Sequence, residues 1–176
     1  MTEINIDGCQ ITHYPAQVLA GAAKPVDKID DNIRRLIDKM VDIMIEQKGV
    51  GLAAPQAGVP LRLFIIALDG SRENVRVYIN PTVKTEGPAV ENEEGCLSVP
   101  GIYTKIRRFG KATVTATDID GKLFTEEADG LYARALQHEF DHIEGITIVN
   151  RLSTTARIAH RRQLKKLEEK QENTGS

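Results

Sequence analysis

The spacing of hydrophobic residues in the first third of the chain predicts a helix. Apolar side chains recur every three or four positions between residues 33 and 44, which is the period of one helix face. Asp30 or Asp31 precedes this stretch and can cap the helix, and Gly49 follows it as a stop. We therefore expect an amphipathic helix from about residue 30 to residue 48, packed against an apolar surface.

Shorter apolar runs with the two-residue alternation of β-strands follow this helix. Strands are predicted at 61–68, 75–80 and 112–118, with a return at 123–125. Asp69-Gly70 and Asp120-Gly121 lie between them and are typical of turns. A further apolar segment, 146–149, is predicted to be a short strand or extended segment.

A second helical pattern runs from residue 131 to residue 143 and begins after Asp129-Gly130. Its side chains form two apolar faces: one holds Leu131, Ala135, His138 and His142, and the roughly opposite one holds Tyr132, Leu136, Phe140 and Ile143. A helix that is apolar on both sides is typical of a buried position. The two histidines are therefore expected in a pocket and not on an outer surface.

A basic segment closes the chain. Ser153 or Thr154 can cap a last helix at about 153–170, and from Arg151 to Lys170 there are seven Lys or Arg residues and two Glu. This helix is expected to be either a solvated surface element or a docking surface for an anionic partner. Residues 171–176 are predicted to be a disordered tail.

Length and composition favour one soluble domain. The chain has 176 residues, 41% of them hydrophobic, which is enough for a substantial core within a single domain, 1–176. The net charge of -2 gives no overall preference for nucleic acid or acidic membranes. No apolar run approaches the roughly 20 residues of a membrane span, and Met1 to Gln10 lacks the pattern of an export signal.

The candidate chemistry lies in the second helix, in the pentapeptide His138-Glu139-Phe140-Asp141-His142. Residues four apart on a helix lie on one face, with Cβ atoms roughly 5 to 6 Å apart. This spacing suits two imidazole nitrogens that bind one divalent metal ion at about 2.0 to 2.1 Å. Glu139 flanks such a metal, where a base for a metal-bound water is expected.

A hydrolytic metal site typically has three protein ligands and one open position for water. Candidates for the third ligand are Cys96, Cys9, His13, His160 and a carboxylate such as Glu144. Cys96 follows a glycine that allows a tight backbone, and its thiolate would be a strong ligand for a borderline-soft metal. The other two histidines are typical of surface positions, and Cys9 of a small packed side chain. Both cysteines are expected to be free thiols.

Three segments together resemble the signature motifs of the peptide deformylases. They are Gly49-Val50-Gly51-Leu52-Ala53-Ala54-Pro55-Gln56, Glu94-Gly95-Cys96-Leu97-Ser98 and Gln137-His138-Glu139-Phe140-Asp141-His142, in the family's order and at similar separations. The resemblance extends over nearly the whole chain. It implies an α+β fold in which antiparallel β-sheets wrap around a central metal-binding helix, with an N-terminal and a C-terminal helix.

The resemblance also implies roles for the site residues and makes the single domain a catalytic one. Cys96, His138 and His142 would bind the metal, and Glu139 would be the general acid/base. Gln56 would contribute its side-chain amide to the oxyanion site. The segment 15–21 lacks an arginine that many relatives carry after a leucine, which affects local packing and not the site.

The implied reaction is hydrolysis of the N-terminal formyl group from formyl-methionine of nascent polypeptides, with release of formate. A metal-bound water would be the nucleophile, and Glu139 would take its proton and return it to the leaving amine. The backbone N–H of Leu97 would join Gln56 in stabilising the oxyanion.

Substrate contacts are expected on both sides of this site. Leu131 and Ala135 share the helix face of the metal ligands and are candidates for the wall of a methionine pocket. Val50 and Gly51 could pair their backbone with an extended peptide. Arg134 lies on the metal face, where it either borders the substrate or turns to solvent.

The resemblance favours Fe2+ as the cofactor, with Zn2+ or Ni2+ able to occupy the site. A ferrous site with a cysteine ligand is vulnerable to oxidation, which fits a reducing cytoplasm. The expected partners are N-formyl-Met nascent peptides, and the basic helix could favour ribosome association through charge. No membrane partner and no specific nucleic acid are expected.

Two other functions use parts of the same pattern. A zinc endopeptidase carries the same helix motif with a His or Glu as third ligand, whereas the cysteine in its Glu-Gly-Cys-Leu-Ser setting favours deformylation. A non-catalytic metal-binding or ribosome-binding module could keep the fold. The presence of all the expected catalytic residues argues against such a module.

Overall fold

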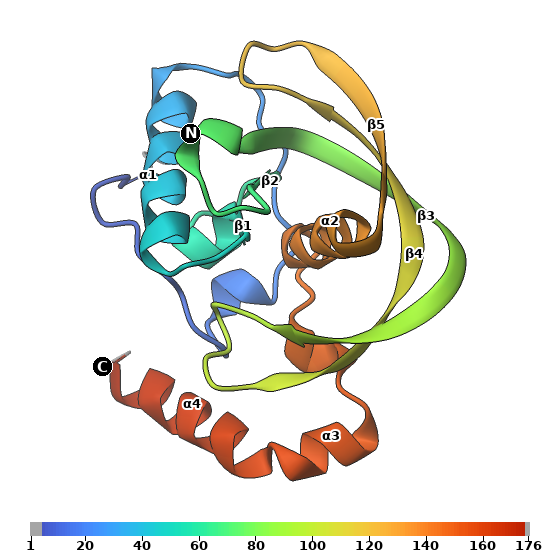
Figure 1. The fold of residues 1–176 in the computed structure, drawn as a ribbon. Helices are drawn as coiled ribbons and strands as arrows, with labels where there is room; N and C mark the ends of the chain where they lie inside the picture. The colour runs from blue at the N-terminus through green and yellow to red at the C-terminus, as the bar shows by residue number, and fades with distance from the viewer. Residues whose placement is uncertain (1–4, 175–176) are drawn as a thin grey trace.

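One five-stranded antiparallel sheet curves around helix α2 (Gly130–Ile143), as Figure 1 shows. The structure is a computed structural model and describes residues 5–174. The strands follow chain order across the sheet: β1 (Gly51–Ala53), β2 (Leu63–Ile66), β3 (Arg76–Gly95), β4 (Tyr103–Thr117) and β5 (Leu123–Asp129). The predicted α+β class is confirmed, with one continuous sheet in residues 5–174 where several sheets were expected.

The hairpin of β3 and β4 is much longer than the sequence pattern predicted. The predicted strands 75–80 and 112–118 form only one end of it, because β3 continues for 20 residues. Its register with β4 shifts twice, at Pro81 and at Gly87-Pro88. Proline cannot donate to the ladder and is confined to edges and bulges, so these residues hid the strand from a pattern-based prediction.

Strand β2 is shorter than the predicted 61–68. Its start is set by the N–H of Arg62, which donates to the carbonyl of Lys24 at 2.8 Å, outside the sheet. Its end is set by the predicted turn at Asp69-Gly70, where the N–H of Gly70 donates to the carbonyl of Ala67 at 2.9 Å. The turn at Asp120-Gly121 is also formed, with Gly121 at a φ of 82°.

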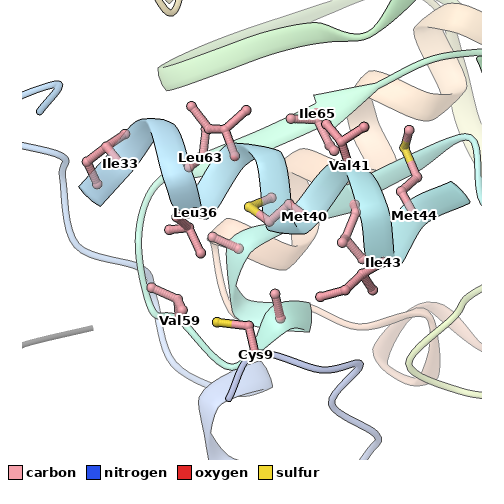
Figure 2. Close-up of a cluster of buried hydrophobic side chains, with 14 of the residues drawn as sticks. Cys9, Ile33, Leu36, Met40, Val41, Ile43, Met44, Val59, Leu63 and Ile65 are labelled. Atoms are coloured by element: carbon pink, nitrogen blue, oxygen red, sulfur yellow. The ribbon is translucent and has the colours of Figure 1, made fainter. Parts of the chain in front are cut away.

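Helix α1 (Asp31–Glu46) confirms the first predicted helix. The Asp30 side chain caps it by accepting from the N–H of Ile33 at 3.1 Å. Lys48, at a φ of 55°, takes the left-handed conformation at its end, in place of the predicted stop at Gly49. Figure 2 shows the apolar face of α1 packed on the sheet, where Ile33, Leu36, Met40, Val41 and Met44 lie close to Leu63 and Ile65.

Helix α2 passes through the domain, as its two apolar faces predicted. Nine of its 14 side chains are buried, so only a minority contact solvent. Ala133, Ala135, Leu136 and Ile143 pack in a second cluster with aromatic residues of the sheet, Phe64 and Tyr78. The strands β3, β4 and β5 wrap one side of this helix, and β1 and β2 separate it from α1 (Figure 1).

The segment after α2 differs from its prediction. Residues 146–149 do not form a strand, because the side chain of Asn150 accepts from the N–H and hydroxyl of Thr147 at 2.8 and 2.9 Å. These bonds turn the chain into the 3-10 helix η4 (Ile148–Arg151). The other short 3-10 helices are η1 (Gln17–Leu19), η2 (Ala54–Ala57) and η3 (Arg72–Asn74).

The predicted C-terminal helix is present as two consecutive helices, with His160 between them. They are α3 (Thr154–Ala159), capped by the Ser153 hydroxyl, and α4 (Arg161–Thr174). The expected disordered tail is wrong for residues 171–174, which continue α4, whereas 175–176 lie outside the described residues. Leu164 anchors α4 in a third apolar cluster. No helix among residues 5–174 is long and apolar enough to span a bilayer.

Candidate metal centre and active site

Three side chains from two parts of the fold converge next to the middle of α2. Cys96 follows the last residue of β3, and His138 and His142 lie one turn apart on α2. Their ligand atoms all lie within 4.8 Å of one another. His142 Nε2 is 3.3 Å from both Cys96 Sγ and His138 Nε2. Among the candidates for a third ligand, Cys96 is therefore the one that the β3–β4 hairpin brings next to the two histidines.

The other candidates for the third ligand lie elsewhere. Cys9 is buried in the cluster under α1, and Glu144 is paired with Arg62 at 2.6 Å. Neither His13 nor His160 belongs to a metal-binding group among residues 5–174. Both cysteines are free thiols, as predicted.

Glu94 orients His138. The carboxylate lies 3.1 Å from His138 Nδ1 and is bound by the Arg108 guanidinium at 2.7 and 3.0 Å. Burial opposes its charge, but these hydrogen bonds prevail and hold the pKa of Glu94 at about 2. An ionised carboxylate only accepts hydrogen bonds, so Nδ1 of His138 carries a proton that it donates to Glu94, and Nε2 is the nitrogen that faces His142.

The donor set fits a divalent metal. Burial disfavours a charged Cys96 thiol, but the neighbouring His142 and His138 outweigh it and lower its pKa well below the ordinary 9.0. Burial likewise opposes a charged His138, whereas its contacts with Cys96 and Glu94 raise its pKa. One thiolate and two imidazoles, with ligand atoms within 4.8 Å of one another, are the kinds of ligand that zinc or ferrous iron prefers.

Glu139 is buried beside these ligands with one free acceptor. Only 4% of its surface is exposed, and its Oε2 has no hydrogen-bond partner among the described residues. Burial raises its pKa above the ordinary 4.5. A desolvated carboxylate with an unpaired oxygen next to a metal-ligand set can accept a proton from a water molecule.

The amide of Gln56 is fixed in one orientation. Its Oε1 accepts from the N–H of Ala53 at 2.8 Å, which places Nε2 on the other side, 3.6 Å from Cys96 Sγ. The side chain is 1% exposed and projects from the 3-10 turn η2. Its N–H group therefore points at the metal-ligand set, as the predicted oxyanion role requires.

Leu97 lies in the turn that follows Cys96. The N–H of Val99 donates to the Cys96 carbonyl at 3.0 Å and closes this turn. Within residues 5–174 the backbone N–H of Leu97 donates no hydrogen bond, so it stays available next to the ligands. A Cβ on Gly49 would lie 2.8 Å from Leu97 Cδ1, so Gly49 and the Leu97 side chain are close neighbours.

The four residues predicted to contact the substrate differ in exposure. Val50 is 42% exposed and Gly51 begins the edge strand β1, whose second edge is unpaired within the described sheet. Leu131 is 62% exposed at the start of α2, whereas Ala135 is buried in the second apolar cluster. The assignment of these four residues to a substrate stays a prediction.

Comparison with known proteins identifies the family. The family model described as polypeptide deformylase matches residues 9–157. This chain belongs to the polypeptide deformylase family. A peptide deformylase of Chromobacterium violaceum is 44% identical over 158 residues, which cover 90% of this chain and 95% of the relative. One of Neisseria meningitidis serogroup C is 44% identical over 156 residues, which cover 89% and 93%.

Solved structures of the family have the same fold. A peptide deformylase from Legionella pneumophila superposes with a TM-score of 0.86 at 43% identity and covers 93% of this chain and 96% of its own. The plant peptide deformylase PDF1B gives a TM-score of 0.91 at 34% identity, with coverages of 99% and 95%. The resemblance drawn from the three deformylase motifs is thereby confirmed.

Sequence reasoning missed the buried charges that support the site. Glu94 stood in a recognised deformylase motif but received no role, and Arg134 was expected at the substrate or in solvent. Instead, Arg134 is buried and donates to Glu94, to the Ile106 carbonyl at 3.0 Å and to the Val90 carbonyl at 2.8 Å. The available signal was alternation along β4, where charged Arg108 takes an inward position two residues after apolar Ile106.

Proposed function

We propose that this chain hydrolyses the N-terminal formyl group of formyl-methionyl nascent peptides and releases formate. The observation that carries the proposal is the convergence of Cys96, His138 and His142 with the unpaired carboxylate of Glu139, in a chain of the deformylase family. The relatives named peptide deformylase are similar over nine-tenths of the chain, which supports the same activity here.

Cys96, His138 and His142 would hold one divalent metal ion. When bound, such an ion supplies Lewis acidity, which polarises a carbonyl oxygen and lowers the pKa of water. Glu139 accepts the proton of the attacking water at its unpaired Oε2 and later delivers it to the nitrogen of the leaving amine. Burial, which raises the pKa of Glu139, brings this carboxylate closer to the neutral range that an acid/base shuttle needs.

Two donors would stabilise the charge that develops on the formyl oxygen. Gln56 Nε2 is held in place by the bond between its Oε1 and Ala53, and the Leu97 N–H is free to bind. Such preorganised donors need no rearrangement during the reaction, and loss of one donor in comparable sites costs about 10²- to 10³-fold in turnover.

The substrate would lie between β1 and the start of α2. Val50, just before β1, and Gly51, its first residue, would pair their backbone with the extended peptide along the free edge of the sheet. The methionine side chain would contact the exposed Leu131 and the wall near Ala135. This placement points the formyl group at the ligand set.

We propose Fe2+ as the working metal, with Zn2+ or Ni2+ able to occupy the same ligands. A thiolate with two imidazoles does not by itself select among these ions. Metal analysis of anaerobically purified protein, paired with turnover, tests this assignment. Full activity with zinc and none with iron would contradict it.

The activity itself is tested with three peptides. Purified, metal-loaded protein is incubated with formyl-Met-Ala-Ser, with its unformylated counterpart and with a longer internal peptide, and formate and new amines are measured. Formate from the first peptide alone is expected. Cleavage of the internal peptide would instead identify an endopeptidase, and no turnover with any metal would identify a non-catalytic binding module.

We further propose that α4 associates with ribosomes from a cytoplasmic location. The exposed side chains of Arg161, Arg162, Lys165 and Lys166 form its outer face, and buried Leu164 holds it to the domain. Lys165→Glu with Lys166→Glu should reduce ribosome co-sedimentation, whereas reversal of the exposed Lys84 and Lys111 should not. Equal co-sedimentation of both double variants would contradict the docking role. The free thiols are consistent with a reducing compartment.

A further inference from the structure

A continuous path of buried ion pairs leads from the metal-ligand set to the segment after α2. His138 contacts Glu94, and Glu94 accepts hydrogen bonds from Nε and Nη2 of Arg108. The remaining nitrogen of Arg108 donates to Asp141 Oδ2 at 2.8 Å. Asp141 in turn is bound by Arg151, with Nε at 2.6 Å from Oδ2.

Every inner member of this path is closed off from water. The side chains of Arg108, Glu94 and Asp141 are 3%, 7% and 9% exposed. A charge in such a position depends on its partners, because solvent cannot replace them. Arg108 is therefore held between two carboxylates, and together with Arg134 it sets the position of Glu94.

Arg151 is the outer member and the only one of these charges that comes from outside the sheet and α2. It is the last residue of η4, and its side chain is 39% exposed. It binds both oxygens of Asp141, so it fixes the plane of that carboxylate. The same segment is tied down by Arg157, which donates to the Val149 carbonyl at 2.7 Å.

We propose that Arg151 is a positioning residue for the metal centre. By fixing Asp141 it holds Arg108 in register, and Arg108 then keeps Glu94 on the Nδ1 side of His138. The inference rests on the proposed metal site but not on the substrate. Through Arg151, η4 would contribute to metal retention, although it lies outside the three deformylase motifs.

Without Arg151, one side of Asp141 is left to water and its carboxylate is free to rotate. Arg108 then loses a fixed partner, and the Glu94–His138 pair loses one restraint, although Arg134 still binds Glu94. Changes in the groups that orient a metal-ligating histidine typically weaken metal binding about 10- to 100-fold. Since Arg151 acts through three intermediate residues, we expect an effect near the lower end, about tenfold.

The test uses the full chain as Arg151→Met, Arg151→Lys and the matched control Arg157→Met. Arg157→Met removes a hydrogen bond in the same segment without touching Asp141. Zinc release from each loaded protein is followed with a chromophoric chelator. The visible spectrum of each cobalt(II)-loaded protein reports ligand geometry, and the melting temperature is measured with and without metal.

Arg151→Met should release zinc about tenfold faster, shift the cobalt spectrum and reduce the gain in melting temperature on metal binding. Arg151→Lys keeps the positive charge but cannot make the bidentate contact with Asp141, so its effects should be smaller than those of Arg151→Met. Arg157→Met should keep wild-type release and spectrum. Wild-type release and spectrum in Arg151→Met would overturn the inference, as would equal losses in the two methionine variants. Failure of the wild-type protein to bind any metal would overturn the proposed site itself.

Discussion

Gly51 lies directly against the carboxylate of Glu139. A Cβ built on Gly51 would fall 2.5 Å from Glu139 Oε1 and 2.9 Å from Cδ, closer than such atoms can approach. The edge strand β1 and α2 therefore meet at a position that only glycine can occupy without displacing Glu139, the proposed acid/base. The first and third deformylase motifs depend on each other through this contact.

Gly51→Ala should impair turnover while the metal is retained. The added methyl group must push Glu139 away from the ligand set, and a displacement of about 1 Å in a reacting group can cost on the order of 10²-fold in rate. Turnover of formyl-Met-Ala-Ser and the metal-to-protein ratio are measured together. Gly21→Ala is the matched control, because a Cβ at Gly21 meets nothing within 4 Å. Similar rates for both variants would contradict the positioning role of Gly51.

Glu139→Gln separates proton transfer from metal binding. The amide keeps the shape of the side chain but cannot take a proton from water, so turnover should fall by about 10²- to 10⁴-fold. Metal content should stay near that of the unmodified chain, because Cys96, His138 and His142 are intact.

Cys96→Ala gives the opposite comparison, since it should lose metal first and activity as a consequence. Near-normal turnover in Glu139→Gln would show that another group is the base.

A cluster of two tyrosines and Glu126 should set the alkaline limit of stability. Burial, aided by the hydrogen bond with Glu126, raises the pKa of Tyr132 from 10.0 to about 12, and burial raises the pKa of Tyr78 further still. The folded chain then holds protons that the unfolded chain loses. The stabilisation is complete below pH 10 and is lost as the pH rises through about 12.

Urea unfolding between pH 9 and pH 12, with phenolate absorbance recorded in parallel, checks this limit. In Tyr132→Phe, which has no phenol to ionise, the decline with pH should be shallower. An equally steep decline in that variant would remove Tyr132 from the explanation.

The parts of the site that the sequence predicted are those encoded locally. His138 and His142 are four residues apart, so helix geometry alone places them together. The Gln56 amide and the N–H of Leu97 were predictable only through the family motifs, because no spacing rule brings η2 to the turn after β3. Alternation failed for most of β3, where Pro81 and exposed polar side chains conceal a strand.

The contacts among the buried charges that support the site could not be predicted from the sequence, because they join residues that are distant along the chain. Arg108 meets Glu94 across the hairpin and meets Asp141 across 33 residues of sequence. Each contact depends on the register of β3 with β4 and on the depth of α2 inside the sheet. The alternation after Ile106 indicates an inward position for Arg108, but nothing in the sequence indicates that Glu94 and Asp141 are its partners.

Arg134 should matter for stability more than for catalysis. Its side chain neither borders the predicted substrate site nor turns to solvent. It is buried and donates hydrogen bonds to Glu94 and to the carbonyls of Val90 and Ile106. Arg134→Leu would remove a donor from each of these two carbonyls and leave Glu94 with one cation fewer. The free energy of unfolding should fall by about 3 kcal/mol, as for other buried pairs that lose one partner.

Urea denaturation of the metal-free chain measures this loss without interference from the cofactor. Arg107→Leu is the control, because Arg107 is exposed on the same strand as buried Arg108 and should change stability by less than about 0.5 kcal/mol. Arg108 still binds Glu94 in Arg134→Leu, so the folded variant should retain its metal. Unchanged stability in Arg134→Leu would mean that water replaces the guanidinium, and metal loss would mean that Arg134, and not Arg108 alone, holds Glu94 against His138.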